Sequence, residues 1–310
     1  SEVSLAMDRT TGQLFAIKSV ADAYSADTYR VDPVGREKEV LKTLRYRFSG
    51  QGESHIVECF GYFVVEDHVC FVLEYMECGS LEDVCRVAAA AGWTPEGVLP
   101  EEVLAVVARD SLHALCRLHE ASEPIVHRDI KPSNLLVNSH GKVKLADFNT
   151  ARVVRGSMKS AHTYTGSTHY MAPERIDSSS HTAVSDIWSL GLTLYTLAMG
   201  ENPYEKLSGT LMDLIREVVE GKPPQLPRDL GPLNVPFSES FRDFLGRCLV
   251  QDPEERASAA ELAQHPWVLH APDSDWFSSW LEQAAEDAAE WEEQEDSSPH
   301  LLHDPEPMSM

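Results

Sequence analysis

One stretch of charged and polar residues, 126–137, constrains the fold of this chain more than any other. It reads Val-His-Arg-Asp-Ile-Lys-Pro-Ser-Asn-Leu-Leu-Val, and a turn at residues 138–141 and a second β-rich segment at 142–145 follow it. Two short β-rich segments joined by a Gly-containing turn predict a hairpin. That hairpin brings Asp147, just beyond its second strand, close to Asp129, so we expect the fold to be built around it.

The residue types in this stretch suit phosphoryl transfer. One carboxylate, Asp129, can orient a substrate hydroxyl, while a second carboxylate and an amide, Asp147 and Asn134, can hold Mg²⁺ against phosphates. The spacing also fits the catalytic-loop pattern H-R-D-x-x-x-x-N. The alternative is an ordinary hairpin with scattered polar residues. It is disfavoured, because a match at so many spaced positions rarely arises by chance.

Composition narrows the partners and the cellular compartment. The formal net charge is -24, from 26 Lys and Arg against 50 Asp and Glu, so nucleic acid is not expected to bind. The six cysteines form no C-x-x-C pair and indicate reduced thiols. No apolar run is long enough to span a membrane, and no signal-like segment is present. A cytoplasmic protein without a membrane partner is therefore expected.

The first part of the chain predicts a small sheet with one helix. Residues 3–6 and 14–20 are β-rich around a Gly-containing turn and read as a hairpin, and 56–65 and 69–73 form a second pair of strands. Between the pairs, residues 34–44 predict a helix. Lys18 would usually face solvent in such a strand, but here Glu37 on the helix can reach back towards it.

After residues 74–80 the pattern becomes helical. Residues 88–100 predict a loop. Four apolar or amphipathic segments follow it, namely 100–119, 186–199, Leu211–Glu220 and 239–250. Ser258 and Glu261 form a capping box that begins a further helix. Residues 271–310 predict an acidic tail that is solvated and partly disordered; the aromatic residues Trp276, Phe277, Trp280 and Trp291 are the features that could instead anchor it.

From Val3 to about Trp267 the chain resembles a eukaryotic protein kinase. The markers stand in the family's order: Ala16–Lys18, Glu37, His127–Asp129, Asn134, Asp147–Phe148, Ala172–Glu174, Asp186–Gly191 and Asp252–Arg256. The resemblance implies an α+β, bilobal fold. Residues 1–76 would form part of the small β-sheet lobe with its one helix, and 77–270 the larger, mainly helical lobe.

The resemblance also implies the site residues. ATP would bind between the lobes, near the linker at 74–76, and Lys18 would pair with Glu37 and contact its α- and β-phosphates. Asp129 would orient the substrate hydroxyl, Lys131 would neutralise the γ-phosphate, and Asn134 and Asp147 would bind Mg²⁺. The implied ATP-binding set is Val3, Ala16, Lys18, Glu37, Leu73, Glu74, Met76, Asn134 and Asp147. Glu174 and Arg256 resemble a buried structural ion pair, and Arg128 the cation that docks a phosphorylated loop.

More narrowly, residues 126–137 and 166–175 look like those of MAP kinase kinases. Lys131, two residues after Asp129, is typical of Ser/Thr kinases. The resemblance implies a MAP kinase substrate and an upstream activating kinase that phosphorylates Ser157 and Thr163. Ser160 or Thr165 is the alternative assignment.

The chain departs from the family's pattern in two places. Asn149 stands where the family has Gly, a residue used where φ is unusual, so a less mobile loop or lower activity is expected. The register from Val3 to Lys18 puts Ser1 at the last position of the Gly-rich loop, which predicts that this loop and the first strand are missing and that the chain binds ATP weakly. Two rivals remain open: another Ser/Thr kinase of the same group, and a pseudokinase or scaffold.

Overall fold

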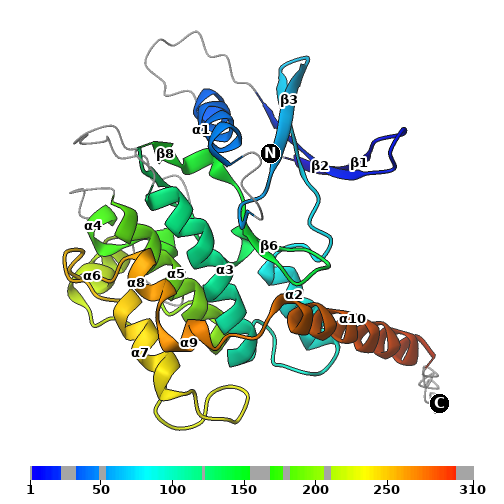
Figure 1. Ribbon diagram of the computed structural model, residues 1–310. Helices are drawn as coiled ribbons and strands as arrows, with labels where there is room; N and C mark the ends of the chain where they lie inside the picture. The colour runs from blue at the N-terminus through cyan, green and yellow to red at the C-terminus, as the bar shows by residue number, and fades with distance from the viewer. Residues whose placement is uncertain are drawn as a thin grey trace, which may run out of the picture.

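The structure, a computed structural model, describes residues 2–21, 33–48, 54–120, 123–153, 168–176, 182–205 and 211–297. It is an α+β fold in which a small sheet with one helix lies over a larger, helical part (Figure 1). β4 ends at Glu74 and α2 begins at Leu81, so the chain passes from one part to the other through residues 75–80.

The small part is an antiparallel sheet of four described strands in the order β1-β2-β4-β3. Its strands are β1 (Glu2–Met7), β2 (Leu14–Ala21), β3 (Cys59–Val65) and β4 (His68–Glu74), with α1 (Pro33–Phe48) beside them. The expected pairs of strands and the helix between them are confirmed, with β3 beginning later than the sequence pattern suggested.

The buried face of α1 explains how a carboxylate enters the interior of the small part. Val34, Leu41 and Leu44 are buried and recur at helical spacing, so they lie on one face of the helix. Glu37, three residues after Val34, shares that face and is only 3% exposed. Because a buried carboxylate needs a partner, its position already points to a cation on the facing strand.

The helical part is built around two central helices, α3 (Glu101–His119) and α5 (Ala183–Met199). Both are apolar over most of their circumference, as expected for helices enclosed on all sides. Around them lie α2 (Leu81–Ala90), α4 (Pro173–Ile176), α6 (Leu211–Glu220), α7 (Glu239–Cys248), α8 (Ala259–Ala263) and α9 (Pro266–Leu269). The capping box of Ser258 with Glu261 is confirmed at the start of α8.

Short strands and 3-10 turns lie at the junction of the two parts. The predicted hairpin is confirmed: β6 (Leu135–Val137) pairs with β7 (Val143–Leu145) in antiparallel register. The second short pair is β5 (Ile125–Val126) with β8 (Arg152–Val153). The 3-10 turns are η1 (Pro132–Asn134), η2 (Phe148–Thr150) and η3 (Thr168–Tyr170).

The tail differs from the solvated segment that its charge predicts. Residues Ser274–Ser297 form α10, which packs against α2 (Figure 1). Phe277, Leu281 and Ala284 are buried at helical spacing, and Trp280 packs against the core beside them. Burial of these apolar residues offsets the self-repulsion of the acidic face, so a solvated tail is wrong for this segment. The side chain of Trp291 and residues 298–310 lie outside the described part.

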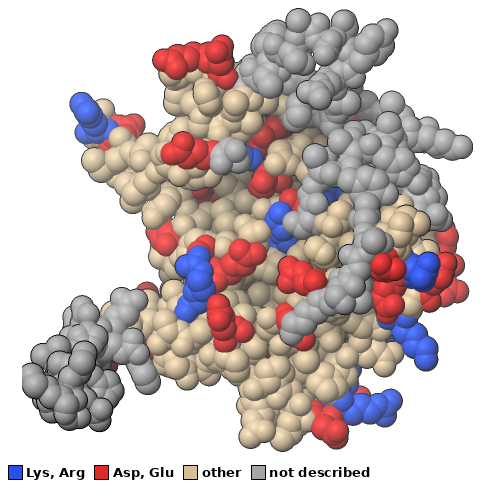
Figure 2. All heavy atoms as spheres, turned by 180° about the vertical axis from the view of Figure 1, so that it is seen from behind, with Lys and Arg blue, Asp and Glu red and all other residues tan. Residues whose placement is uncertain are grey.

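Acidic side chains outnumber basic ones in this protein. On the face shown in Figure 2, acidic side chains are spread widely and basic ones are sparser, in keeping with the net charge of -24. Among the described helices, none combines the length and the apolar sequence that crossing a bilayer requires.

Candidate active site

Lys18 joins three elements at the centre of the site. It lies on β2 and is buried, and its Nζ is 2.7 Å from Glu37 Oε1 on α1 and 2.8 Å from Asp147 Oδ1 beyond β7. Burial opposes the charge of Lys18, but the two carboxylates outweigh burial and raise its pKa. For Asp147 the charged partner also outweighs burial, and the pKa shifts in the opposite direction: Lys18 lowers the pKa of that carboxyl. Both groups are therefore charged at neutral pH.

Asp129, Lys131 and Asn134 form a compact group on the loop before β6. The amide nitrogen of Asn134 donates to Asp129 Oδ2 at 2.9 Å and to the Asp129 carbonyl at 2.7 Å. Lys131 Nζ lies 3.1 Å from Asp129 Oδ2. The 3-10 turn η1 begins with Pro132, whose fixed φ suits this position, and this turn brings Asn134 back onto Asp129.

A buried carboxylate on α5 fixes the backbone of this loop. Asp186 accepts hydrogen bonds from the backbone N–H groups of His127 and Arg128, both at 2.8 Å. His119 Nε2 on α3 lies 3.0 Å from the same carboxylate. Burial raises the pKa of Asp186, but the bond to His119 and its other partners lower it, so the group is ionised. Arg128 is held in the left-handed region at φ 76°, an uncommon conformation for a residue other than glycine.

His127 connects the loop to the segment after β7. Its Nε2 is 2.9 Å from the Ala146 carbonyl oxygen, and its ring meets the buried Phe148 edge-on at 4.8 Å between centroids. Burial lowers the pKa of His127, so the ring is neutral at pH 7. Since η2, which begins with Phe148, lies against α1, this contact links the small part to the loop.

The backbone around Asn149 differs from what its glycine-like position suggests. The left-handed residue is Asp147, at φ 60°, while Asn149 lies inside the 3-10 turn η2. The Asn149 N–H lies 3.4 Å from Asp147 Oδ1. No positive φ is needed at position 149 in this conformation, so a side chain there is compatible with the observed backbone.

Sheet register places most of the expected nucleotide-facing residues together. Val3 is opposite Lys18, and Ala16 is opposite Leu73. Directly opposed residues share a face of the sheet, as do residues two apart on one strand, so these four lie on one face. Val3 is 63% exposed there.

The two remaining expected residues of this set lie at the end of β4 and beyond it. Glu74 pairs through its side chain with Lys144 Nζ on β7 at 2.6 Å. Met76, in the connection to the helical part, is buried. Ser157 and Thr163, with the alternatives Ser160 and Thr165, fall outside the described residues.

The buried ion pair expected in the helical part is confirmed. Arg256 reaches Glu174 with two nitrogens, at 2.7 and 2.9 Å, and its guanidinium lies 5.3 Å from the centre of the Trp188 ring. Ser185 Oγ donates to the same carboxylate at 2.7 Å. This bidentate arrangement fixes α4, which follows the segment 154–167, against the helical core.

Sequence reasoning missed two positioning residues. His119 supports Asp186, and Arg175 donates from Nη1 to the Arg128 carbonyl at 2.7 Å. A polar residue on the buried face of an apolar helix is the signal that could have revealed His119. Arg175 gives no such signal, because its neighbours along the chain do not predict its burial.

Comparison with known proteins agrees with this geometry. The protein kinase domain family matches residues 1–268. Mitogen-activated protein kinase kinase 1 of Arabidopsis thaliana is 34% identical over 278 residues, which is 88% of this chain and 72% of that protein. This chain belongs to the MAP kinase kinases, a family of protein kinases.

Two fungal protein kinases show a similar level of identity over smaller shares of their own length. MAP kinase kinase MKK1/SSP32 of Saccharomyces cerevisiae is 34% identical over 83% of this chain and 48% of its own length. Protein kinase wis1 of Schizosaccharomyces pombe is 37% identical over 76% of this chain and 37% of its own length. The chain is thus a Ser/Thr or dual-specificity protein kinase, an enzyme class whose phosphate donor is ATP.

Proposed function

We propose that this kinase phosphorylates the Thr and Tyr of the activation loop of a MAP kinase. The observation that carries the proposal is the Lys18 ammonium between the carboxylates of Glu37 and Asp147, with Asp129 and Asn134 on the neighbouring loop. This pairing supports an enzyme over a scaffold, because a kinase must have both the Lys–Glu pair and the metal-binding carboxylate in place. The names of the relatives support a MAP kinase substrate.

In this proposal Lys18 contacts the α- and β-phosphates of ATP and keeps them in line for transfer. Asp147 and Asn134 fit a Mg²⁺ site, because carboxylate and amide oxygens are hard ligands. The amide nitrogen of Asn134 is directed at Asp129, which leaves its oxygen as the ligand atom. A bound Mg²⁺ would supply neutralisation of the phosphate charge.

Asp129 then handles the proton of the substrate hydroxyl. The hydroxyl oxygen forms a bond to the γ-phosphorus as the bond to the β-phosphate oxygen breaks, ADP leaves, and the hydroxyl proton passes to Asp129. Lys131, 3.1 Å from Asp129, stabilises the charge on the transferred phosphoryl group. Lys18 and Lys131 would act without rearrangement, because neighbouring carboxylates already orient both ammonium groups.

Activation is proposed to follow phosphorylation of Ser157 and Thr163 by an upstream kinase. Arg128 supports this, because it places a cation directly after His127 in the loop that carries Asp129. A phosphorylated activation loop needs such a cation to dock on. The bidentate Glu174–Arg256 pair would fix the far end of the same segment.

The test is phosphate transfer by the full-length gene product carrying Ser157→Glu and Thr163→Glu. It receives ATP, Mg²⁺ and a catalytically inactive MAP kinase, and the control carries Asp147→Ala in addition. Label on both Thr and Tyr of the substrate loop, absent in the control, is the expected result. Label on a generic protein alone would retain the kinase and reject this substrate, and a folded protein that labels nothing would favour a scaffold.

A further inference from the structure

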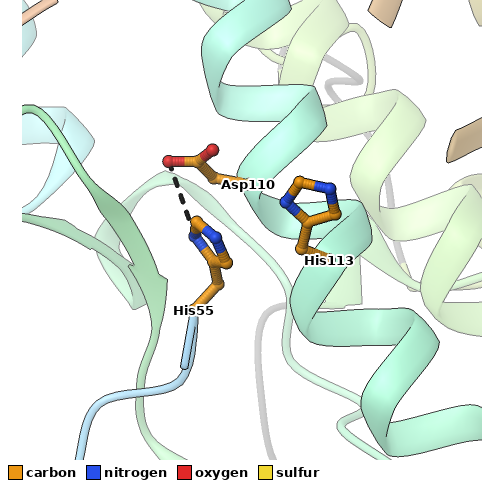
Figure 3. Close-up of side chains that lie close together, drawn as sticks. All are labelled: His55, Asp110 and His113. Atoms are coloured by element: carbon orange, nitrogen blue, oxygen red, sulfur yellow. Dashed lines mark ion pairs between the residues drawn. The ribbon is translucent and has the colours of Figure 1, made fainter. Parts of the chain in front are cut away.

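Three side chains of metal-ligand type converge on one side of α3 (Figure 3). Asp110 and His113 are three residues apart on α3 and so lie on the same face of the helix. His55 approaches them from the segment before β3. The ligand atoms of the three residues all lie within 4.8 Å of one another, and the two imidazole rings are 5.0 Å apart between centroids.

The carboxylate of this cluster is buried and firmly oriented. Asp110 is 0% exposed, and its Oδ1 accepts from Arg109 Nε at 2.9 Å while its Oδ2 accepts from the Val143 N–H at 3.0 Å. His55 Nδ1 lies 3.6 Å from the same Oδ2 and 3.3 Å from the Val143 carbonyl oxygen. Such outer partners set the direction of a ligand before an ion arrives.

The two imidazoles meet the other requirements of a ligand. Burial lowers the pKa of both His55 and His113, an effect that the carboxylate of Asp110 opposes and the cation of Lys142 reinforces. Neutral imidazole is the form that binds metal ions, and at pH 7 no proton has to be displaced from a charged ring. His113 is exposed, so the cluster is open to solvent on that side.

We propose that His55, Asp110 and His113 bind a divalent transition-metal ion of the Zn²⁺ type, with water completing the coordination. Two imidazole nitrogens and one carboxylate oxygen form a ligand set that Zn²⁺ uses when one position stays open. Mg²⁺ is disfavoured, because it is bound through oxygen atoms and retains several waters.

Small movements of side chains suffice to close the site. Zinc bonds of about 2.0–2.2 Å in a tetrahedron place ligand atoms about 3.3–3.6 Å apart, closer than the widest separation here, 4.8 Å. His113 can supply the movement by rotating about its side-chain bonds, since it is exposed. The segments that carry the buried Asp110 and the partly buried His55 need not move.

An ion at this site would join the two parts of the fold. The His55 carbonyl accepts from the Leu145 N–H at 2.9 Å, and the Val57 N–H donates to the Leu145 carbonyl at 3.0 Å. β7 is thus attached to the His55 segment, and Asp110 attaches α3 to the same strand. A ligand that binds only the folded state raises its stability, so the melting temperature should rise with Zn²⁺ concentration.

The test is calorimetric titration of the chelator-stripped protein with ZnCl₂, alone and with Mg²⁺ in excess. We expect one site that Mg²⁺ does not occupy and a rise in melting temperature. His113→Ala should weaken binding by at least about tenfold without unfolding the protein, because His113 is exposed. The matched control is His140→Ala, which removes an exposed histidine from the β6–β7 turn and should leave the affinity unchanged. His55→Gln should weaken binding as His113→Ala does.

The proposal is overturned if His113→Ala and the unaltered protein bind Zn²⁺ equally. It is also overturned if the protein binds no Zn²⁺ under these conditions, or if Asp147→Ala rather than His113→Ala removes binding. Titration with Co²⁺ gives a second readout: a thiolate charge-transfer band would place the ion on a cysteine and contradict the site. Absorption of tetrahedral Co²⁺ without that band, lost in His113→Ala, would support it.

Discussion

At the scale of single residues, the uncommon backbone conformations of the site occur at two positions. Arg128 and Asp147 both have φ in the left-handed region, which costs of order 1–3 kcal/mol for a residue other than glycine. Each is fixed by partners: Asp186 holds the N–H of Arg128, and Lys18 holds the carboxylate of Asp147. In this conformation the carboxylate of Asp147 meets Lys18 at 2.8 Å.

Asn149 gives the first prediction, through the variant Asn149→Gly. Because residue 149 lies within η2 without a positive φ, glycine removes no strain there and costs about 0.5–1 kcal/mol in backbone entropy. Even if this whole cost fell on the activation barrier, kcat would stay within about fivefold of the unaltered protein, since about 1.4 kcal/mol corresponds to tenfold. We also expect the melting temperature to fall slightly. Steady-state kinetics and thermal unfolding check this. A large gain in activity would mean that Asn149 restrains the loop in another conformation.

At the scale of elements, the Glu174–Arg256 pair connects α4 to the segment before α8. Arg256→Met leaves the buried carboxylate of Glu174 without its cation, and removing one partner of a buried pair costs about 3–5 kcal/mol. The control, Arg247→Met, breaks an exposed pair with Asp243 and should cost about 0–1 kcal/mol. Urea unfolding of both variants gives the comparison. Equal losses would show that the buried pair contributes no more than a surface one.

The same pair predicts a dependence of stability on pH. Burial raises the pKa of Glu174, but Arg256 outweighs burial and holds it below the ordinary value of 4.5. A carboxyl whose pKa is lower in the folded state stabilises the fold fully above its unfolded pKa, and this contribution is lost as pH falls through the folded value. Glu174→Gln should therefore show a weaker loss of stability on the acid side than the unaltered protein.

The docking of α10 on α2 gives another prediction at this scale. Phe277 is fully buried, and Phe277→Ala should cost about 3–5 kcal/mol locally and release α10. Trp93 Nε1 donates to Asp287 at 2.8 Å, a second attachment that should become mobile with it. Limited proteolysis should cut this variant within 274–297 faster than Trp276→Ala, the control, whose side chain is 39% exposed. Equal cleavage of the two variants would contradict docking through Phe277.

At the scale of the whole molecule, charge of one sign dominates. A net charge of -24 makes the compact state repel itself, and salt screens this repulsion with a Debye length of about 10 Å at 0.1 M. We therefore expect the melting temperature to rise by a few degrees as NaCl increases from low concentration to 0.3 M. Differential scanning calorimetry measures the change, and sucrose at matched osmolality serves as the uncharged control. A fall in melting temperature would mean that attractive pairs outweigh the net repulsion.

The sequence by itself determined the local features of this protein. The hairpin of residues 135–145, the amphipathic α1 with Glu37 on its apolar face, and the capping box of α8 depend on neighbours a few residues apart. The resemblance to protein kinases likewise predicted the pairing of Lys18 with Glu37, which the structure shows. Such features are predictable because periodicity and turn chemistry act over short distances along the chain.

Only the tertiary structure decided what depends on contacts between distant segments. The unusual φ belongs to Asp147 and not to Asn149, because Lys18, 129 residues away in sequence, fixes the carboxylate. The acidic tail forms a docked helix because α2 offers it an apolar face, and the composition of the tail does not reveal that face. His55, Asp110 and His113 meet for the same reason: burial and approach are set by packing, which no local pattern of residues encodes.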